Sequence, residues 1–130
     1  MDLSKTPITV YIIDDDDGVR RALARMFKSA RFTSQQFAAT TDLLDTDIES
    51  RRTCIVADLK IAGDEPLKLP NHLAARSIKV PIVFVSADDS DVNRGRVRAV
   101  GGFGLFRKPV DSQALIDAVR WAIDGQEAIG

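Results

Sequence analysis

The chain has 130 residues, of which 45% are hydrophobic, so it can bury a core and is too apolar to be intrinsically disordered. Its 18 basic and 19 acidic side chains leave a net charge of −1, which gives no electrostatic basis for binding nucleic acid or a membrane surface. The single cysteine, Cys54, lies in an apolar run, which indicates a buried thiol in a reducing compartment. No apolar stretch approaches the roughly 18 residues of a membrane span and no signal-peptide pattern is present, so we expect a cytoplasmic protein.

The first half of the chain alternates strand-like and helix-like segments. Residues 8–13 form a short, β-branched, apolar run of the kind found in buried parallel strands. Apolar residues then recur at helical spacing from Val19 to Phe27, and Asp16 and Asp17 suit the N-terminus of that helix. The pattern continues with three further elements: a weaker strand at about 33–38, a short helix near 41–46 and a strand at 53–58.

The second half of the chain continues this alternation. Pro70 limits where a helix can begin, so we expect an irregular segment from about 59 to 69, followed by a short helix. The remaining elements are predicted in this order: a strand at 80–85, a helix near 90–100, a strand at 103–106 and a last helix at about 112–124. Alternating strands and helices predict an α/β domain in which helices cover both faces of a parallel sheet.

Reactive side chains stand at the ends of four predicted strands. The acidic run Asp14–Asp17 follows the first strand, Asp58 ends the third, Ser86 ends the fourth, and Lys108-Pro109 follows the last. Parallel strands bring their carboxyl ends to one edge of the sheet, where open α/β sheets bind their ligands. We therefore expect these groups to meet in one site.

The chemistry of this set is coherent. Carboxylates that converge are oxygen ligands for Mg²⁺, which prefers octahedral oxygen donors. Two negative charges ~4 Å apart repel by ~4 kcal/mol at an effective dielectric of ~20, and a cation relieves this repulsion. One carboxylate then remains available as a nucleophile toward phosphorus. Because Lys108 supplies a positive charge and Ser86 a hydroxyl donor for phosphoryl oxygens, the set predicts Mg²⁺-dependent phosphoryl chemistry.

The sequence resembles the receiver domain of bacterial two-component response regulators over nearly the whole chain. The residues that carry the resemblance are Asp14-Asp15, Arg20, Asp58, Ser86-Ala87 and Lys108-Pro109. The segment from Val10 to Phe27 is most similar to receivers that precede a helix-turn-helix output domain. The resemblance implies that residues 1–130 form one receiver domain. Its expected fold is flavodoxin-like (βα)5, a doubly wound parallel sheet of strand order 2-1-3-4-5.

The resemblance also implies the chemistry of the acceptor. Asp58 would be the phospho-acceptor, receiving a phosphoryl group from a histidine kinase or a phosphotransfer protein. Asp15, Asp58 and the carbonyl group of Lys60 would bind Mg²⁺ directly, and Asp14 would act through water. The domain would catalyse only its own phosphorylation and dephosphorylation, so we do not expect a conventional enzyme.

Two further implications concern the phosphoryl group and the output. Ser86 and Lys108 would contact the phosphoryl group beside Asp58, and the Lys108–Pro109 peptide bond would be cis. The signal would leave through the surface formed by the helix near 90–100, the strand at 103–106 and the last helix. The same surface is the expected site of a homodimer, and this segment would not itself bind nucleic acid or a membrane.

The switch positions depart from the family's usual pattern. Ser86 is the usual hydroxyl, but Leu105 stands where receivers usually carry Tyr or Phe, whose rotamer follows that hydroxyl. Gly95 lies within the predicted helix near 90–100, where glycine costs ~1 kcal/mol relative to alanine. Our hypothesis is that this helix is weakly fixed and reports phosphorylation through its own ordering.

Two alternative functions stay open at this point. The run from Asp15 to Val19 also fits the first motif of haloacid-dehalogenase-type phosphotransferases, with Asp15 as nucleophile, Asp17 as general acid and Ser86 in the second motif. That family expects an acidic pair downstream, and none follows Lys108. The other alternative is a receiver-like interaction module that works without phosphate. Its warning signs are Leu105 and the altered segment after the third predicted strand, where Ile61, Ala62 and Pro66 replace the family's usual residues.

Two side chains allow more than one interpretation. Lys60 is either a solvated side chain or one that leans toward the phosphoryl site. Trp121 lies away from the core-facing side of the last helix, so we expect it to be exposed, either in contact with a partner or as a surface aromatic.

Overall fold

The parallel sheet has the predicted strand order. The computed structural model describes residues 6–129, with side chains as far as residue 126. Within these residues, five parallel strands form one sheet in the order β2-β1-β3-β4-β5. Their bounds are β1 Thr9–Ile13, β2 Thr33–Phe37, β3 Thr53–Asp58, β4 Ile82–Ser86 and β5 Gly104–Arg107. The flavodoxin-like α/β fold and the order 2-1-3-4-5 are therefore confirmed.

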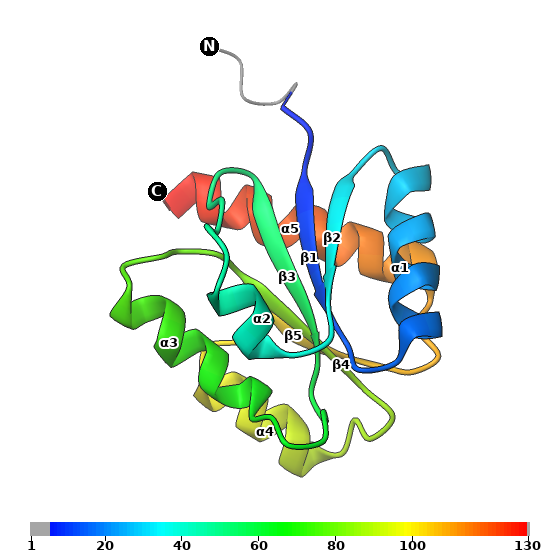
Figure 1. Cartoon of the computed structure of the whole chain (residues 1–130), viewed down its shortest axis with the longest axis vertical. Coiled ribbons are helices and arrows are strands. Elements are labelled where there is room, and N and C mark those ends of the chain that lie inside the picture. The colour runs from blue at the N-terminus through cyan, green and yellow to red at the C-terminus, as the bar shows by residue number, and fades with distance from the viewer. Residues whose placement is uncertain (1–5, 130) are drawn as a thin grey trace.

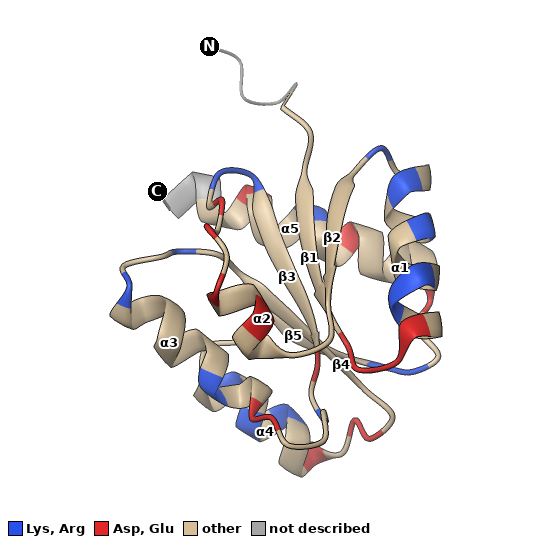
Figure 2. Ribbon diagram, in the orientation of Figure 1, with Lys and Arg blue, Asp and Glu red and all other residues tan. Residues whose placement is uncertain are grey.

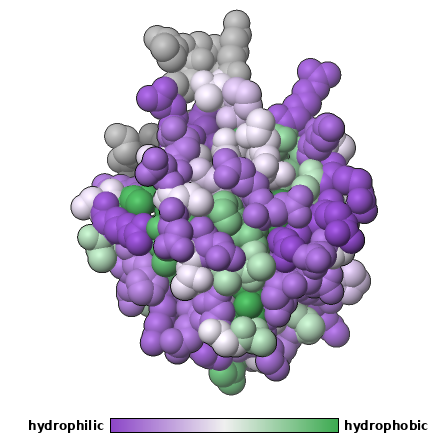
Figure 3. Space-filling view, viewed as in Figure 1, coloured by the Kyte–Doolittle hydropathy of each residue, from purple (hydrophilic) through white to green (hydrophobic). Residues whose placement is uncertain are grey.

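Helices cover both faces of this sheet. In the part of the chain that the structure describes they are α1 Asp17–Ser29, α2 Thr40–Leu44, the 3-10 turn η2 Pro66–Lys68, α3 Leu69–Ala75, α4 Asp91–Ala99 and α5 Ser112–Ile129. Figure 1 shows α1 and α5 on one face and α2, α3 and α4 on the other. The face that carries α2 and α3 is mainly hydrophilic (Figure 3). Among residues 6–129, no helix combines the length and the apolar character needed to cross a bilayer.

Alternate residues of the central strands β1, β3 and β4 supply the two halves of the core. On β3, Cys54 and Val56 pack with α1 and α5, whereas Ile55 and Ala57 pack with α2, α3 and α4. All six residues of β3 are buried, as in a central parallel strand. The edge strand β2 has no buried residue, which explains its weak apolar pattern in the sequence. Burial raises the pKa of the Cys54 thiol to about 12, so the thiol stays protonated and unreactive.

The segment that follows β3 agrees with its prediction. Regular α-helix begins only at Leu69, after the 3-10 turn, and Pro70 lies in its first turn. Within the segment, the Asp64 carboxylate accepts hydrogen bonds from the Thr40 backbone N–H (2.7 Å) and hydroxyl (2.6 Å). It thereby caps α2, whose own N-cap residue, Ala39, has no side chain that can do so. The segment leading away from the site is thus fixed to a neighbouring helix.

The helix ends differ modestly from the prediction. α2 is shorter than the predicted 41–46, and α5 continues past residue 124 to Ile129. The Lys108–Pro109 peptide bond is cis, as predicted. Trp121 is 73% exposed on α5, also as predicted.

Two glycines near α4 should respond in opposite ways to substitution by alanine. A Cβ at Gly95, inside α4, would meet open space, so Gly95→Ala should raise the free energy of unfolding by ~0.5–1 kcal/mol. A Cβ at Gly102 would lie 2.6 Å from Val97 Cγ1 and 3.0 Å from Phe84 Cε2, so Gly102→Ala should lower it by ~1–3 kcal/mol. Urea denaturation measures both changes. Equal effects of the two substitutions would contradict the packing around Gly102.

Candidate functional site

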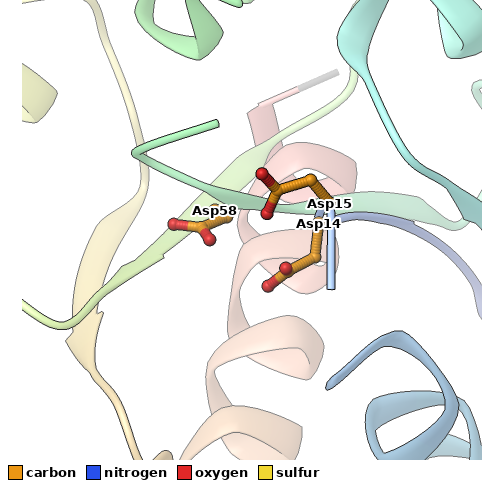
Figure 4. Close-up of side chains that lie close together, drawn as sticks. All are labelled: Asp14, Asp15 and Asp58. Atoms are coloured by element: carbon orange, nitrogen blue, oxygen red, sulfur yellow. The ribbon is translucent and has the colours of Figure 1, made fainter. Parts of the chain in front are cut away.

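Three carboxylates meet at the carboxyl edge of the sheet. Asp14 and Asp15 follow β1, and Asp58 ends the adjacent strand β3. One oxygen from each of the three lies within 4.8 Å of the others. Figure 4 shows these side chains close together, coming from the two strand ends. The predicted convergence is therefore present, and the cluster can hold a metal ion.

Lys108 supplies one positive charge to the two buried carboxylates of this cluster, Asp14 and Asp58. Its Nζ donates to Asp14 Oδ2 and to Asp58 Oδ2, each at 2.8 Å. The Asp14 and Asp58 side chains are only 1% and 10% exposed. Burial alone would lower the pKa of Lys108, but the hydrogen bonds that it donates to the Asp14 and Asp58 carboxylates, together with their negative charges, outweigh burial and raise that pKa. The stabilising effect of the charged lysine is therefore complete below its ordinary pKa of 10.5 and is lost only as pH rises above it.

The four consecutive aspartates have different surroundings. The buried Asp14 accepts from the Asp16 backbone N–H through Oδ1 (2.9 Å). Asp16 in turn caps α1 through a backbone N–H of its first turn, and this bond is the main cause of its lowered pKa. Asp17 forms an ion pair with Arg20. Asp15 is exposed and has no hydrogen bond or ion pair among the described residues, so its carboxylate is free to bind a cation.

Asp58 is oriented from two sides. The Lys60 backbone N–H donates to Asp58 Oδ1 at 3.0 Å, while Lys108 contacts Oδ2. The Lys60 side chain is exposed, and its charge contributes to the lowered pKa of Asp88 after the larger effect of the Ser90 hydrogen bonds. Lys60 and Asp88 belong to the lining of a cleft of about 340 Å³ that also includes Ser86. This placement fits a solvated lysine at the rim of the site.

A chain of hydrogen bonds leads from Ser86 to α4, and its full extent was not predictable from the sequence. Ser86, 4% exposed, accepts from the Asp88 backbone N–H through Oγ at 3.0 Å. Asp88 Oδ1 accepts from the Ser90 N–H (2.9 Å), and Ser90 Oγ caps α4 by accepting from the Asn93 N–H (3.3 Å). Asn93 Nδ2 donates back to the Asp88 carbonyl (2.9 Å). Only the serine before a predicted helix was a visible signal.

Leu105 takes part in packing and in a backbone contact. Its side chain is 6% exposed and belongs to the half of the core that α4 covers. Its carbonyl lies 3.5 Å from an Arg94 guanidinium nitrogen of α4, and Arg94 also pairs with Asp89 at 3.1 Å. Leu105 therefore contacts α4 without an aromatic ring or a polar tip.

The sequence matches one family over most of its length. Residues 10–120 match the response regulator receiver domain. The chain belongs to this family. In the receiver, Asp17, which the haloacid-dehalogenase alternative needs as a general acid, pairs instead with Arg20. A receiver is not a conventional enzyme, and the domain belongs to two-component signal transduction.

Similar proteins include transcriptional regulators and solved receivers. The receiver is 34% identical over 116 residues to the transcriptional regulatory protein TdiR of Thauera aromatica, covering 88% of this chain and 51% of TdiR. It is 30% identical over 113 residues to FixJ of Azorhizobium caulinodans, covering 87% and 54%. The crystal structure of FixJ-N superposes with a TM-score of 0.82 at 22% identity, covering 92% and 95%, which supports the fold alone. The chain thus spans about half the length of these curated relatives.

Removal of the Lys108 charge should destabilise the receiver. Lys108→Met leaves Asp14 and Asp58 without a counter-charge and should lower the free energy of unfolding by ~2–4 kcal/mol in Mg²⁺-free buffer. Added Mg²⁺ should recover more stability in this variant than in the wild-type protein. Urea denaturation with and without Mg²⁺ measures both effects, with the exposed Lys79→Met as control. A loss no larger than that of Lys79→Met would contradict the proposed compensation of charge.

Proposed function

We propose that Asp58 accepts a phosphoryl group from a histidine kinase or a phosphotransfer protein in a Mg²⁺-dependent reaction. The observation that carries the proposal is the position of Asp58 between Lys108 and the acidic pair Asp14-Asp15. Residues 1–130 would act as one receiver domain in the cytoplasm. Asp58 is a buried carboxylate that accepts hydrogen bonds from the Lys60 backbone N–H and from Lys108, and it lies close to the exposed carboxylate of Asp15.

The donor set fits Mg²⁺. The three carboxylates offer only hard oxygen ligands, and Asp15 has no competing partner among the described residues. Asp15 and Asp58 would hold the ion, with the Lys60 carbonyl as the predicted further ligand and Asp14 acting through water. When bound, Mg²⁺ offsets negative charge on the carboxylates and on the transferring phosphoryl group.

Asp58, Lys108 and Ser86 would each have a separate role in the phosphoryl transfer. A carboxylate oxygen of Asp58 bonds to phosphorus as the nitrogen–phosphorus bond of a phosphohistidine breaks, and the imidazole leaves with the bonding electron pair. Lys108, already in contact with Asp58, supplies positive charge to the phosphoryl oxygens. The Ser86 hydroxyl accepts from Asp88 and keeps its own proton, so it can donate to a phosphoryl oxygen.

A groove beside the site suits the phosphoryl donor. It has a volume of about 470 Å³ and runs between α1 and the turn that follows β5. Lys108 stands in its wall, so a partner seated there reaches the edge of the site. Its lining is mainly apolar: Val19, Ala22, Leu23, Met26, Val85, Pro109 and Val110. Arginines on the exposed side of α1 (Figure 2) would favour an acidic partner surface.

The output would leave through α4, with the α4, β5 and α5 surface as the proposed site of a homodimer. The hydrogen bonds from Ser86 end at the N-cap of α4, so a movement of Ser86 toward a phosphoryl group changes the start of that helix. Trp121 and Phe103, 73% and 45% exposed, add aromatic area on α5 and before β5. The competing function, an interaction module that needs no phosphate, is supported by the absence of an aromatic residue at Leu105 and by the unusual residues of the segment between β3 and α3.

Labelling of Asp58 tests the proposed function directly. Acetyl phosphate or phosphoramidate should produce an acyl phosphate only when Mg²⁺ is present, and Asp58→Asn should abolish it. Asp15→Asn should weaken the dependence on Mg²⁺ while Asp58 remains available. Mass spectrometry of the intact protein measures the added phosphoryl group. Labelling that survives Asp58→Asn would overturn the proposal, and no labelling of the wild-type protein would favour the phosphate-independent module.

Phosphorylation should also change the amide hydrogen exchange of residues 88–102. A beryllofluoride mimic of the acyl phosphate draws Ser86 toward Asp58 and should alter exchange at the start of α4. Ser90→Ala removes the cap, which costs ~1 kcal/mol, and should speed exchange there without the mimic. Hydrogen exchange measured by mass spectrometry detects the effect of the mimic and the effect of Ser90→Ala. Slow exchange that the mimic leaves unchanged would contradict a role for α4.

A further inference from the structure

Arg20 joins the two ends of the acidic run Asp14–Asp17. Its side chain, only 14% exposed, extends from α1 back to the end of β1. One guanidinium nitrogen donates to the Asp14 backbone carbonyl, and the other donates to the Asp17 carboxylate. Figure 2 shows the acidic turn next to the basic residues of α1. Arg20 thus holds the turn at both of its ends, with a fork of fixed geometry.

This contact affects the position of Asp15, the one carboxylate of the run for which the described residues provide no hydrogen-bond or ion-pair partner. Asp15 lies between the Asp14 carbonyl and the start of α1, so its position depends on the backbone that Arg20 holds. Four adjacent negative charges repel one another, which favours an expanded turn. Mg²⁺ tolerates little deviation from octahedral geometry, so a displaced Asp15 would be a poor ligand. We infer that Arg20 is a positioning residue of the metal site, directing Asp15 toward Asp58 through the backbone of the turn.

The charge of Arg20 and its contacts predict opposite effects. A positive charge beside the carboxylates opposes the binding of a cation, so loss of the charge alone would strengthen Mg²⁺ binding. Loss of the contact between Arg20 and the turn would instead weaken Mg²⁺ binding. The Asp17 partner is 71% exposed, and an exposed ion pair contributes little, so the bond to the Asp14 carbonyl is the important one. The sign of the change in Mg²⁺ affinity therefore separates the two roles.

Four variants separate these effects. Arg20→Gln removes the fork and the charge, whereas Arg20→Lys keeps the charge on a single donor that can reach only one partner. Asp17→Asn tests the exposed ion pair and leaves the contact with the carbonyl. Arg21→Gln is the matched control, because Arg21 is the neighbouring exposed arginine and has no hydrogen bond or ion pair in the described chain.

The inference rests on the proposed function, and Mg²⁺ affinity tests it. Isothermal titration calorimetry with MgCl₂ should show dissociation constants about tenfold higher for Arg20→Gln, intermediate for Arg20→Lys, and nearly unchanged for Asp17→Asn and Arg21→Gln. In phosphoramidate labelling, Arg20→Gln should raise the Mg²⁺ concentration for half-maximal rate by a similar factor and leave the saturating rate within about twofold, since outer contacts act on metal affinity. A general loss of structure would lower the Mg²⁺ affinity and also the saturating rate.

The outcomes are distinct. Unchanged or tighter Mg²⁺ binding in Arg20→Gln would overturn the positioning role, as would an equal loss in Arg21→Gln. If Arg20→Gln does not fold, as judged by urea denaturation without Mg²⁺, Arg20→Lys decides by the same criterion: weaker binding supports the role and wild-type affinity overturns it. Absence of Mg²⁺ binding by the wild-type protein would instead overturn the proposed metal site, and this inference with it.

Discussion

The site depends on two buried carboxylates that share one lysine. Asp14 and Asp58 lie almost entirely out of solvent, and each contacts Lys108 at 2.8 Å. Without the lysine, two such charges ~4 Å apart would repel by ~4 kcal/mol at an effective dielectric of ~20, which is a large fraction of the stability of a small domain. The same lysine contacts Asp58, the proposed nucleophile. Folding and the proposed chemistry therefore rely on one contact.

The topology of the sheet creates this contact. In the order β2-β1-β3-β4-β5, the strand that follows β1 in the chain lies on one side of it, and β3, β4 and β5 lie on the other. The point at which the strand order reverses therefore lies between β1 and β3. Asp14 follows one of these strands and Asp58 ends the other. Lys108 follows β5, beyond β4, and reaches both with its long side chain. A parallel sheet thus gathers groups that are far apart in sequence, without any long loop to position them.

Strand ends were predictable from the sequence because apolar runs and the polar residues that close them are local signals. The positions of Asp58, Ser86 and Lys108 followed from these signals and from the parallel order. The surroundings of Asp14 to Asp17 did not follow, because a turn has no fixed period that tells which carboxylate faces inward. The bonds from Arg20 to the turn and from Asp64 to α2 depend on how the turn and the segment after β3 are placed in space, which one sequence alone does not encode in a visible pattern.

The placement of α4 explains how a site with Leu105 can still transmit a signal. Val97 is the only residue of α4 that is buried, so packing fixes this helix weakly. Its start is held instead by hydrogen bonds that lead back to Ser86, each worth ~0.5–1.5 kcal/mol net. Together these bonds amount to a few kcal/mol, the range over which a bound group can shift a two-state equilibrium. The proposed signal would then not require an aromatic rotamer, because Ser86, the proposed partner of the phosphoryl group, already belongs to the chain of bonds that caps α4.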